Sequence, residues 1–171
     1  MATRVADRIV VDTNVLLAAT DRSRAEHQEA LAVLNDWPRQ GTVLYASGQI
    51  LREYLGVATR PTAQNGLGLD RTDALANVHA IRGRVQFLAE DGKVSDRLLA
   101  LVAEVPCGGK QIHDANVVAT MLVHGVESLV TLNVADFARF GKHVQLIGLT
   151  GEAPSHARRI REVAPKHGFE P

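Results

Sequence analysis

Short apolar runs alternate with longer segments of helical pattern along this chain, and that alternation constrains its fold more than any other feature. The first run, residues 9–11 (IVV), is continuous and ends at Asp12, which is typical of a strand that is covered on both faces. We predict further strands at residues 42–45, 85–88, 129–132 and 144–147. Strands that alternate with helices predict an α/β fold with a mainly parallel sheet.

Helices are predicted between these strands from capping residues, helix breakers and apolar spacing. Ser47 and Ser95 are candidate N-caps, and Gly125 ends the last long helix. Residues 61–69 form a Gly- and Asn-rich loop, and residues 133–141 are expected to be a loop or a short turn. The predicted helices cover residues 13–19, 24–37, 48–59, 72 onward, 95–104 and 112–124. The last of these is apolar almost all round, so it is expected to lie centrally on the sheet.

The composition restricts the class of protein. A chain of 171 residues suits one domain, which we place at residues 1–150, followed by a polar C-terminal extension at residues 151–171. Lys+Arg and Asp+Glu both number 19, which argues against a strongly basic coat but leaves room for a local basic rim. Cys107 is the only cysteine, so no intrachain disulfide can form. With no signal peptide or membrane span evident, we expect a cytoplasmic protein without a membrane partner.

Four acidic residues and one asparagine lie where predicted strands end or predicted helices begin or turn. They are Asp12, Glu53, Asp114, Asn133 and Asp136. Ligands of parallel α/β sheets collect at the carboxyl ends of the strands, where three of these residues are expected to meet. Carboxylates gathered in one place concentrate negative charge, which a hard divalent cation neutralises. The pattern therefore favours a metal site with oxygen ligands.

Each of these residues also has a plain structural interpretation. Asp12 could cap the helix that follows it, and Asp114 could serve the free amides at a helix N-terminus. Glu53 falls at the margin of an apolar helical face, where surface carboxylates are common. Asn133 and Asp136 are residues that usually form turns. Asn14 and Thr131 could add oxygens or simply satisfy the backbone, so the case rests on the coincidence of several acids on one edge.

Four segments, taken in order, resemble those of a known family: VVDTNVLL, SGQILREYLGV, IHDANVVATMLVHG and LVTLNVADFARFG. Over roughly residues 9–149 the chain resembles the PIN-domain ribonucleases, and within them the VapC-type toxins of type II toxin–antitoxin pairs. The resemblance implies a three-layer α/β/α fold with a central, mainly parallel sheet. It also implies that Mg²⁺ or Mn²⁺ is held by the quartet Asp12, Glu53, Asp114 and Asp136. Many members have an acid where this chain has Asn133, so Asp136 is expected to carry that charge.

The resemblance further implies an endoribonuclease that hydrolyses RNA, with tRNA as the family-level expectation and mRNA and rRNA left open. Attack by a metal-bound water predicts products with 5′-phosphate and 3′-hydroxyl ends. Arg52, Lys110 and Arg139 lie next to the proposed acids in sequence and could steer phosphate, although solvated surface charge is the alternative for each. The expected partners are a small antitoxin protein that covers the acidic cleft and a second copy of the chain.

Two other functions remain open at this point. The first is a non-catalytic PIN-like module that binds RNA or protein, against which the completeness of the acidic set argues. The second is a phosphatase of the haloacid dehalogenase type, which also places an aspartate after its first strand. That class uses a second acid two residues later, where this chain has Asn14.

Overall fold

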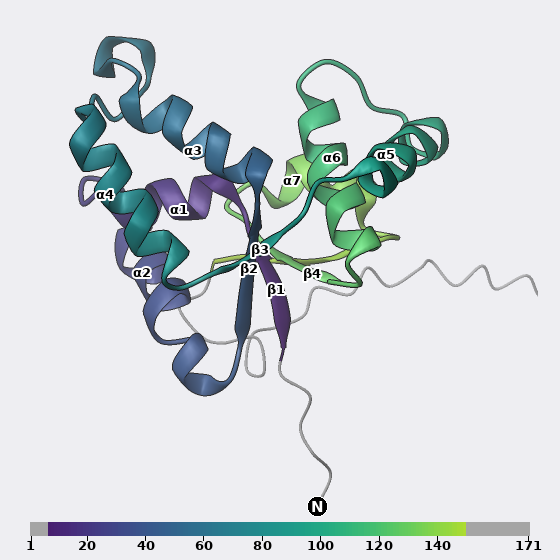
Figure 1. The fold of residues 1–171 in the computed structure, drawn as a ribbon, viewed down its shortest axis with the longest axis horizontal. Coiled ribbons are helices and arrows are strands. Elements are labelled where there is room, and N and C mark those ends of the chain that lie inside the picture. The colour runs from purple at the N-terminus through teal and green to yellow at the C-terminus, as the bar shows by residue number, and fades with distance from the viewer. Residues whose placement is uncertain (1–6, 150–171) are drawn as a thin grey trace, which may run out of the picture.

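The computed structural model describes residues 7–149 and contains a five-stranded sheet with the strand order β3-β2-β1-β4-β5 (Figure 1). Every neighbouring pair of strands is parallel, with Val10 of the central strand opposite Tyr45 on one side and Leu129 on the other. The strands are β1 (Arg8–Val11), β2 (Val43–Ser47), β3 (Gln86–Leu88), β4 (Ser128–Val130) and β5 (Gln145–Ile147). The prediction of a mainly parallel sheet is confirmed.

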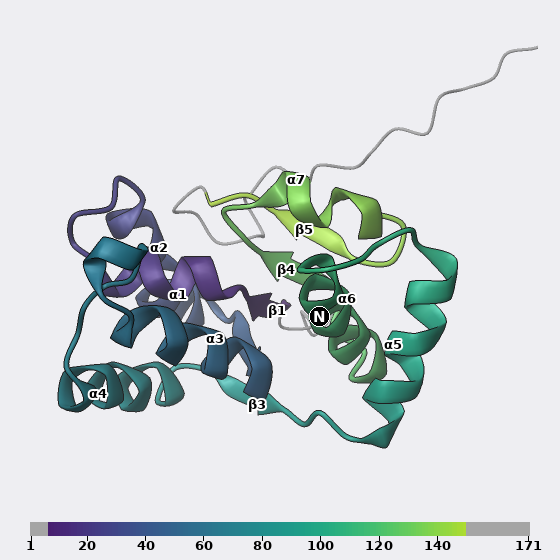
Figure 2. The same cartoon turned by 90° about the horizontal axis from the view of Figure 1, so that it is seen from above.

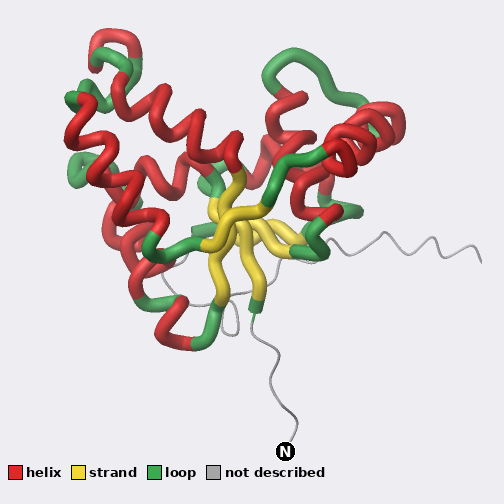
Figure 3. Tube along the Cα trace, viewed as in Figure 1, coloured by secondary structure: helices red, strands yellow, loops and turns green. Residues whose placement is uncertain are grey.

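Helices cover both faces of this sheet, so the predicted three-layer arrangement is confirmed. Figures 1 and 2 show α1 to α4 gathered on one side of the strands and α5 and α6 on the other, and Figure 3 shows the strands between them. The helices are α1 (Thr13–Thr20), α2 (His27–Asn35), α3 (Gly48–Thr59), α4 (Arg71–Arg82), α5 (Gly92–Glu104), α6 (Gln111–Val123) and α7 (Val134–Phe137). Short 3₁₀ turns lie at Pro38–Gln40, Thr62–Gln64 and Ala138–Phe140. No helix within residues 7–149 is long and apolar enough to cross a membrane.

The core forms where the sequence is continuously apolar. Residues 9–11 of β1 are all buried, as expected for a central parallel strand with helices on both faces. Residues 117–121 of α6 are buried too, which confirms the prediction of a central helix packed on the sheet. The two central elements therefore place the residues that follow β1 and those that begin α6 on a rigid frame.

The structure corrects several predicted boundaries. Helix α5 begins at Gly92, not at Ser95, because Asp91 accepts hydrogen bonds from the amides of Lys93 and Val94 and caps the helix four residues before the predicted cap Ser95. Helix α2 covers only His27–Asn35 of the longer span predicted. Residues 133–141, predicted as a loop or a short turn, contain the four-residue helix α7 and a 3₁₀ turn, with Phe137 and Phe140 buried. The predicted extension at residues 151–171 lies outside the described residues.

Candidate active site

Asp12 lies directly after β1 and is only 7% exposed. Its Oδ1 accepts a hydrogen bond from the Thr13 amide at 2.7 Å, so the interpretation as the N-cap of α1 is correct. Its Oδ2 accepts a second bond, from the Thr131 hydroxyl at 2.6 Å. Burial raises the pKa of Asp12 and the nearby charge of Glu53 raises it further, while these two hydrogen bonds oppose the shift. Asp12 is therefore a buried, firmly oriented carboxylate whose charged form is costly without a cation.

Thr131 follows β4 and is completely buried. Its hydroxyl accepts from the Asn14 side-chain amide at 3.2 Å and from the Asn133 backbone amide at 3.0 Å, while it donates to Asp12. One hydroxyl has a single proton and two lone pairs, so these three bonds use its whole capacity. Asn14 in turn accepts from the Leu132 amide at 3.0 Å. Thr131 therefore orients the site and has no lone pair left to offer an ion.

Glu53 lies on α3, half-buried beside the fully buried Tyr54, as its predicted position at the margin of the apolar face requires. Its Oε2 accepts a hydrogen bond from the Thr13 hydroxyl at 2.9 Å. Its Oε1 accepts another from the Gln49 side-chain amide at 2.8 Å. Both oxygens are thus held by neighbouring donors, one from α1 and one from the first turn of α3.

Asp114 lies in the first turn of α6, but it does not cap that helix. The N-cap position belongs to Lys110, and the capping interpretation of Asp114 is wrong because α6 begins at Gln111, which places Asp114 inside the helix. Burial raises the pKa of Asp114 to about 6, and the charges of Asp12, Asp136 and Glu53 add to the rise. Only a group close to all three carboxylates would feel them together. The structure therefore brings these four acids, from four separate elements, within electrostatic range.

Asn133 and Asp136 are exposed at α7. Asn133 occupies the N-cap position of α7 without a side-chain capping bond, and its carbonyl accepts the amide of Asp136 at 3.1 Å. Asp136 is the one whose charge acts on Asp114. That Asp136, and not Asn133, supplies the acid of the last motif stays a prediction.

The basic residues beside the acids differ in how they are engaged. Arg52 pairs with Glu90 at 3.0 Å, so its charge is already offset. Arg139 donates to the backbone carbonyls of Asp136 and Pro106 at 3.3 Å, and its charge opposes the raised pKa of Asp114. Both side chains are exposed. Of these two arginines, Arg139 is therefore the one whose positive charge acts on the acidic site.

Sequence reasoning missed four residues that organise the site: Thr13, Gln49, Glu90 and Asn116. Thr13 and Gln49 contact Glu53, while Glu90 and Asn116 contact Gln49. Gln49 precedes Glu53 by four residues, and side chains at that spacing on a helix face each other. That spacing was the only signal in the sequence, because the other contacts join distant segments.

The donor set suits a hard divalent ion in its chemistry. It consists of carboxylate oxygens and one amide oxygen, and burial together with the neighbouring negative charges raises the pKa of Asp12 and of Asp114. Within residues 7–149, however, no three His, Cys, Asp or Glu side chains are arranged so that they could hold an ion between them. The carboxylates of Asp12 and Glu53 accept hydrogen bonds from their neighbours and still have lone pairs with which to bind an ion. An ion would have to draw the acids of the site closer together than they lie here.

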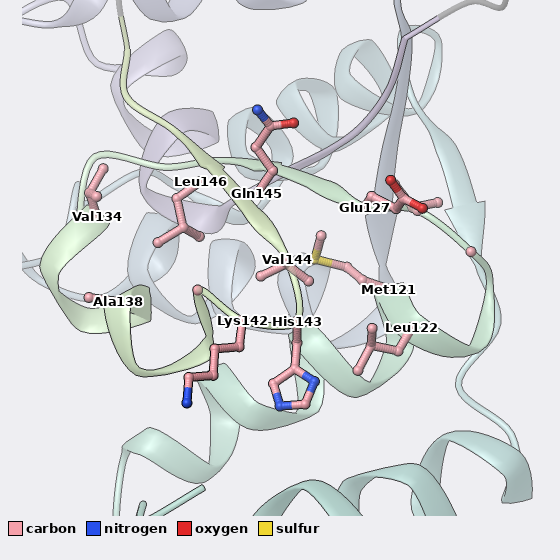
Figure 4. Close-up of a pocket in the computed structure, with 13 residues that line it drawn as sticks. Met121, Leu122, Glu127, Val134, Ala138, Lys142, His143, Val144, Gln145 and Leu146 are labelled. Atoms are coloured by element: carbon pink, nitrogen blue, oxygen red, sulfur yellow. The ribbon is translucent and has the colours of Figure 1, made fainter. Parts of the chain in front are cut away.

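A pocket of about 720 Å³ lies elsewhere, between the end of α6, α7 and the edge strand β5 (Figure 4). Apolar side chains such as Met121 and Leu146 line it together with Lys142 and His143. His143 lies 3.6 Å from the carboxylate of Glu104. None of the five predicted site residues lines this pocket. The acidic site is therefore distinct from this pocket.

Comparison with known proteins gives consistent matches. A family model described as the PIN domain matches residues 9–143. Ribonuclease VapC24 of Mycobacterium tuberculosis is 28% identical over 132 residues, which cover 77% of this chain and 90% of that protein.

Solved structures match the same fold. VapBC2 from Rickettsia felis, bound to a DNA fragment from its promoter, has a TM-score of 0.62 at 16% identity and covers 84% of this chain and 99% of its own. Mycobacterium tuberculosis VapC20, described as a Sarcin-Ricin loop cleaving toxin, has a TM-score of 0.55 at 20% identity. The match covers 71% of this chain and 86% of VapC20. At these identities the likeness shows the fold alone.

Proposed function

This chain belongs to the PIN-domain family, and we propose that it is a metal-dependent endoribonuclease that acts as the toxin of a toxin–antitoxin pair. The observation that carries the proposal is the pKa of Asp114, raised to about 6 by burial and by three other carboxylates. Acids from four separate elements that crowd one another in this way are costly to the apo protein. A bound cation offsets that cost. The match to ribonuclease VapC24 supports RNA as the substrate.

In this proposal Asp12, Glu53, Asp114 and Asp136 hold the ion, and Asn133 offers a neutral oxygen beside them. Bound Mg²⁺ or Mn²⁺ would supply an acidified water and positive charge for the phosphate in the transition state. Thr131 keeps Asp12 in one orientation through its 2.6 Å hydrogen bond. Because the pKa of Asp114 is raised to about 6, a cation bound there would displace any proton that Asp114 carries below that pH. Arg139 offers a positive charge where a phosphate would approach the acids.

A non-catalytic binding module is less consistent with these observations. A surface that only binds RNA has no use for several crowded carboxylates, which repel phosphate unless a cation intervenes. The phosphatase alternative is weaker still, because Asn14 is an amide and its oxygen is engaged by the Leu132 backbone. Neither alternative explains why buried and half-buried acids converge.

The proposed partners are an antitoxin protein and a second copy of the chain. Solved relatives such as the VapBC2 complex from Rickettsia felis contain both members of a toxin–antitoxin pair, which supports a cognate antitoxin here. Such a nuclease needs an inhibitor, since uninhibited it would damage the cell that makes it. We place the action of the protein in the cytoplasm, where RNA and such a partner meet.

The test is end mapping of RNA cut by the purified chain with Mg²⁺ or Mn²⁺. We expect 5′-phosphate and 3′-hydroxyl ends, no cleavage in EDTA, and no cleavage by Asp12→Asn. Cyclic phosphate ends would rule out attack by water. Cleavage that persists in EDTA, or that Asp12→Asn performs normally, would overturn the proposed site.

A further inference from the structure

The side chain of Gln49 connects the two halves of the acidic site. It lies in the first turn of α3 and is only 6% exposed. Its Nε2 donates to Glu53 Oε1 at 2.8 Å and to the carbonyl of His113 on α6 at 2.9 Å. Its Oε1 accepts from Asn116 Nδ2, also on α6, at 2.6 Å. One amide therefore contacts a carboxylate of the site and the helix that carries another.

The orientation of this amide is fixed by its neighbours. The nitrogen faces two acceptors and the oxygen faces a donor, so a flipped amide would set oxygen against oxygen at Glu53 and at His113. Both N–H protons are used, and the oxygen is engaged as well. A buried amide with every proton committed holds its neighbours firmly, because any movement leaves a polar group unpaired.

The backbone of Gln49 is held too. Its amide donates to Glu90 Oε1 at 2.8 Å, and Glu90 also pairs with Arg52 one turn further along α3. Glu90 belongs to the connection between β3 and α5 and so reaches α3 from a different part of the chain. Glu90 thus anchors the backbone of the first turn of α3, from which the Gln49 side chain extends to the site.

Glu53 depends on this arrangement for its orientation. Gln49 holds one carboxylate oxygen, and Thr13, which follows Asp12, holds the other at 2.9 Å. The two donors come from different helices and fix the plane of the carboxylate. His113 and Asn116 lie on either side of Asp114 in sequence, so the same amide also ties Glu53 to the turn of α6 that carries Asp114.

We propose that Gln49 is a positioning residue, which orients the Glu53 carboxylate toward the ion and ties it to the Asp114 turn of α6. The proposal rests on the metal site of the proposed function and adds a residue that acts through Glu53 without touching the ion. Residues that support metal ligands in this way change metal affinity by about 10- to 100-fold when they are replaced.

The experiment measures Mn²⁺ binding to the full chain by calorimetry, without RNA. Gln49→Met keeps the length of the side chain and removes both donors, so we expect binding about 10- to 100-fold weaker than in the wild type. Gln145→Met is the matched control, because the Gln145 side chain lies on β5, and among residues 7–149 its one hydrogen bond is accepted from the Ser128 hydroxyl at 3.4 Å. The control should bind Mn²⁺ like the wild type.

A double-mutant cycle tests whether Gln49 acts through Glu53. In a Glu53→Gln background, Gln49→Met should cause little further loss, because the group it orients has gone. If Gln49→Met binds Mn²⁺ as the wild type does, or if its loss is as large in the Glu53→Gln background, the positioning role is overturned. Should Gln49→Met not fold, Gln49→Asn, which is one methylene shorter, takes its place with the same two outcomes.

Failure of the proposed function gives a different result. In that case the wild type and Asp12→Asn bind Mn²⁺ equally weakly, and the Gln49 proposal falls with it. If the wild type binds and Asp12→Asn does not, the metal site stands, and the Gln49 variants alone decide the positioning role.

Discussion

Thr131 donates its hydroxyl proton to Asp12 across 2.6 Å and so joins two buried residues that are 119 positions apart in sequence. The contact exists because β1 and β4 are neighbours in the sheet, with Val11 paired to Val130. Each residue follows its strand directly, so the parallel register brings them together at the carboxyl edge. The fold itself therefore fixes the orientation of the most buried acid of the site.

Replacing Thr131 by Val should destabilise the protein and impair cleavage. The substitution keeps the shape of the side chain and removes the Thr131 hydroxyl as the partner of Asp12 Oδ2, of the Asn14 side-chain amide and of the Asn133 backbone amide, at a cost of about 1–3 kcal/mol. Thr120→Val is the control, since Thr120 is also buried, and within the described part of the chain its hydroxyl donates only to the Asn116 carbonyl of its own helix. Chemical denaturation and cleavage rates of both variants check this. Equal effects from the two would contradict the role of Thr131.

Asp114→Asn should abolish metal-dependent cleavage and stabilise the metal-free fold at neutral pH. Removing a carboxylate that acts in the transition state costs at least about 100-fold in rate. The pKa of Asp114 is raised from 3.8 to about 6 on folding, so between these values the folded state keeps a proton that the unfolded state has lost. Its contribution to stability is full below pH 3.8 and is lost as the pH rises through about 6.

Thermal unfolding in EDTA tests whether Asp114→Asn raises the stability of the metal-free protein. The variant should melt higher than the wild type at pH 7, and the difference should shrink as the pH falls toward 4. Added Mn²⁺ should raise the melting temperature of the wild type and not that of Asp114→Asn. A variant that is less stable than the wild type at pH 7 in EDTA would show that the acids do not repel one another as the structure implies.

Arg139→Gln should weaken RNA binding and make it less sensitive to salt. A side chain that contacts one phosphate contributes about one unit to the slope of log K against log salt concentration. Arg52→Gln is the control, because Arg52 is already paired with Glu90. Both substitutions are made in the catalytically inactive Asp12→Asn protein. RNA binding, measured over a range of salt concentrations, then compares the effect of Arg139→Gln with that of Arg52→Gln. A larger change in slope for Arg52→Gln would reverse the assignment.

Asp91→Ala should cost about 1 kcal/mol of stability without changing cleavage, because Asp91 caps α5 through the amides of Lys93 and Val94. Ser95→Ala should change stability by less than about 0.5 kcal/mol, since the Ser95 hydroxyl only reaches the Asp91 carbonyl at 3.5 Å. Urea unfolding of the two variants decides between the cap that the structure has and the cap that the sequence suggested.

The wrong N-cap predicted for α5 shows a limit of prediction from local sequence patterns. Asp91 and Ser95 are both residue types that cap helices, and each is followed by residues that suit a helix. Which of the two caps α5 depends on where the chain leaves β3, and the tertiary structure decides that. By contrast, Ser47 was correctly chosen for α3, where its hydroxyl accepts from the Ile50 amide at 3.4 Å. There the preceding strand left only one candidate.

The site was predictable to the extent that its residues follow strands or interrupt apolar helices. Asp12 and Glu53 stand out for that reason, and the parallel sheet makes their convergence reasonable in advance. The hydrogen-bond network was not predictable in the same way. Gln49 reaches His113, 64 positions away, and that contact depends on how α3 and α6 meet. The spacing of residues in the sequence does not predict this contact.

The central claim is that acids from distant segments form one metal site, and a crystal soaked in Mn²⁺ tests it most directly. The anomalous difference map should show an ion bound by oxygens of Asp12 and Asp114, with Glu53 and Asp136 directly or through water beside it. Side chains that point apart with no ion among them, in a crystal saturated with Mn²⁺, would contradict the account.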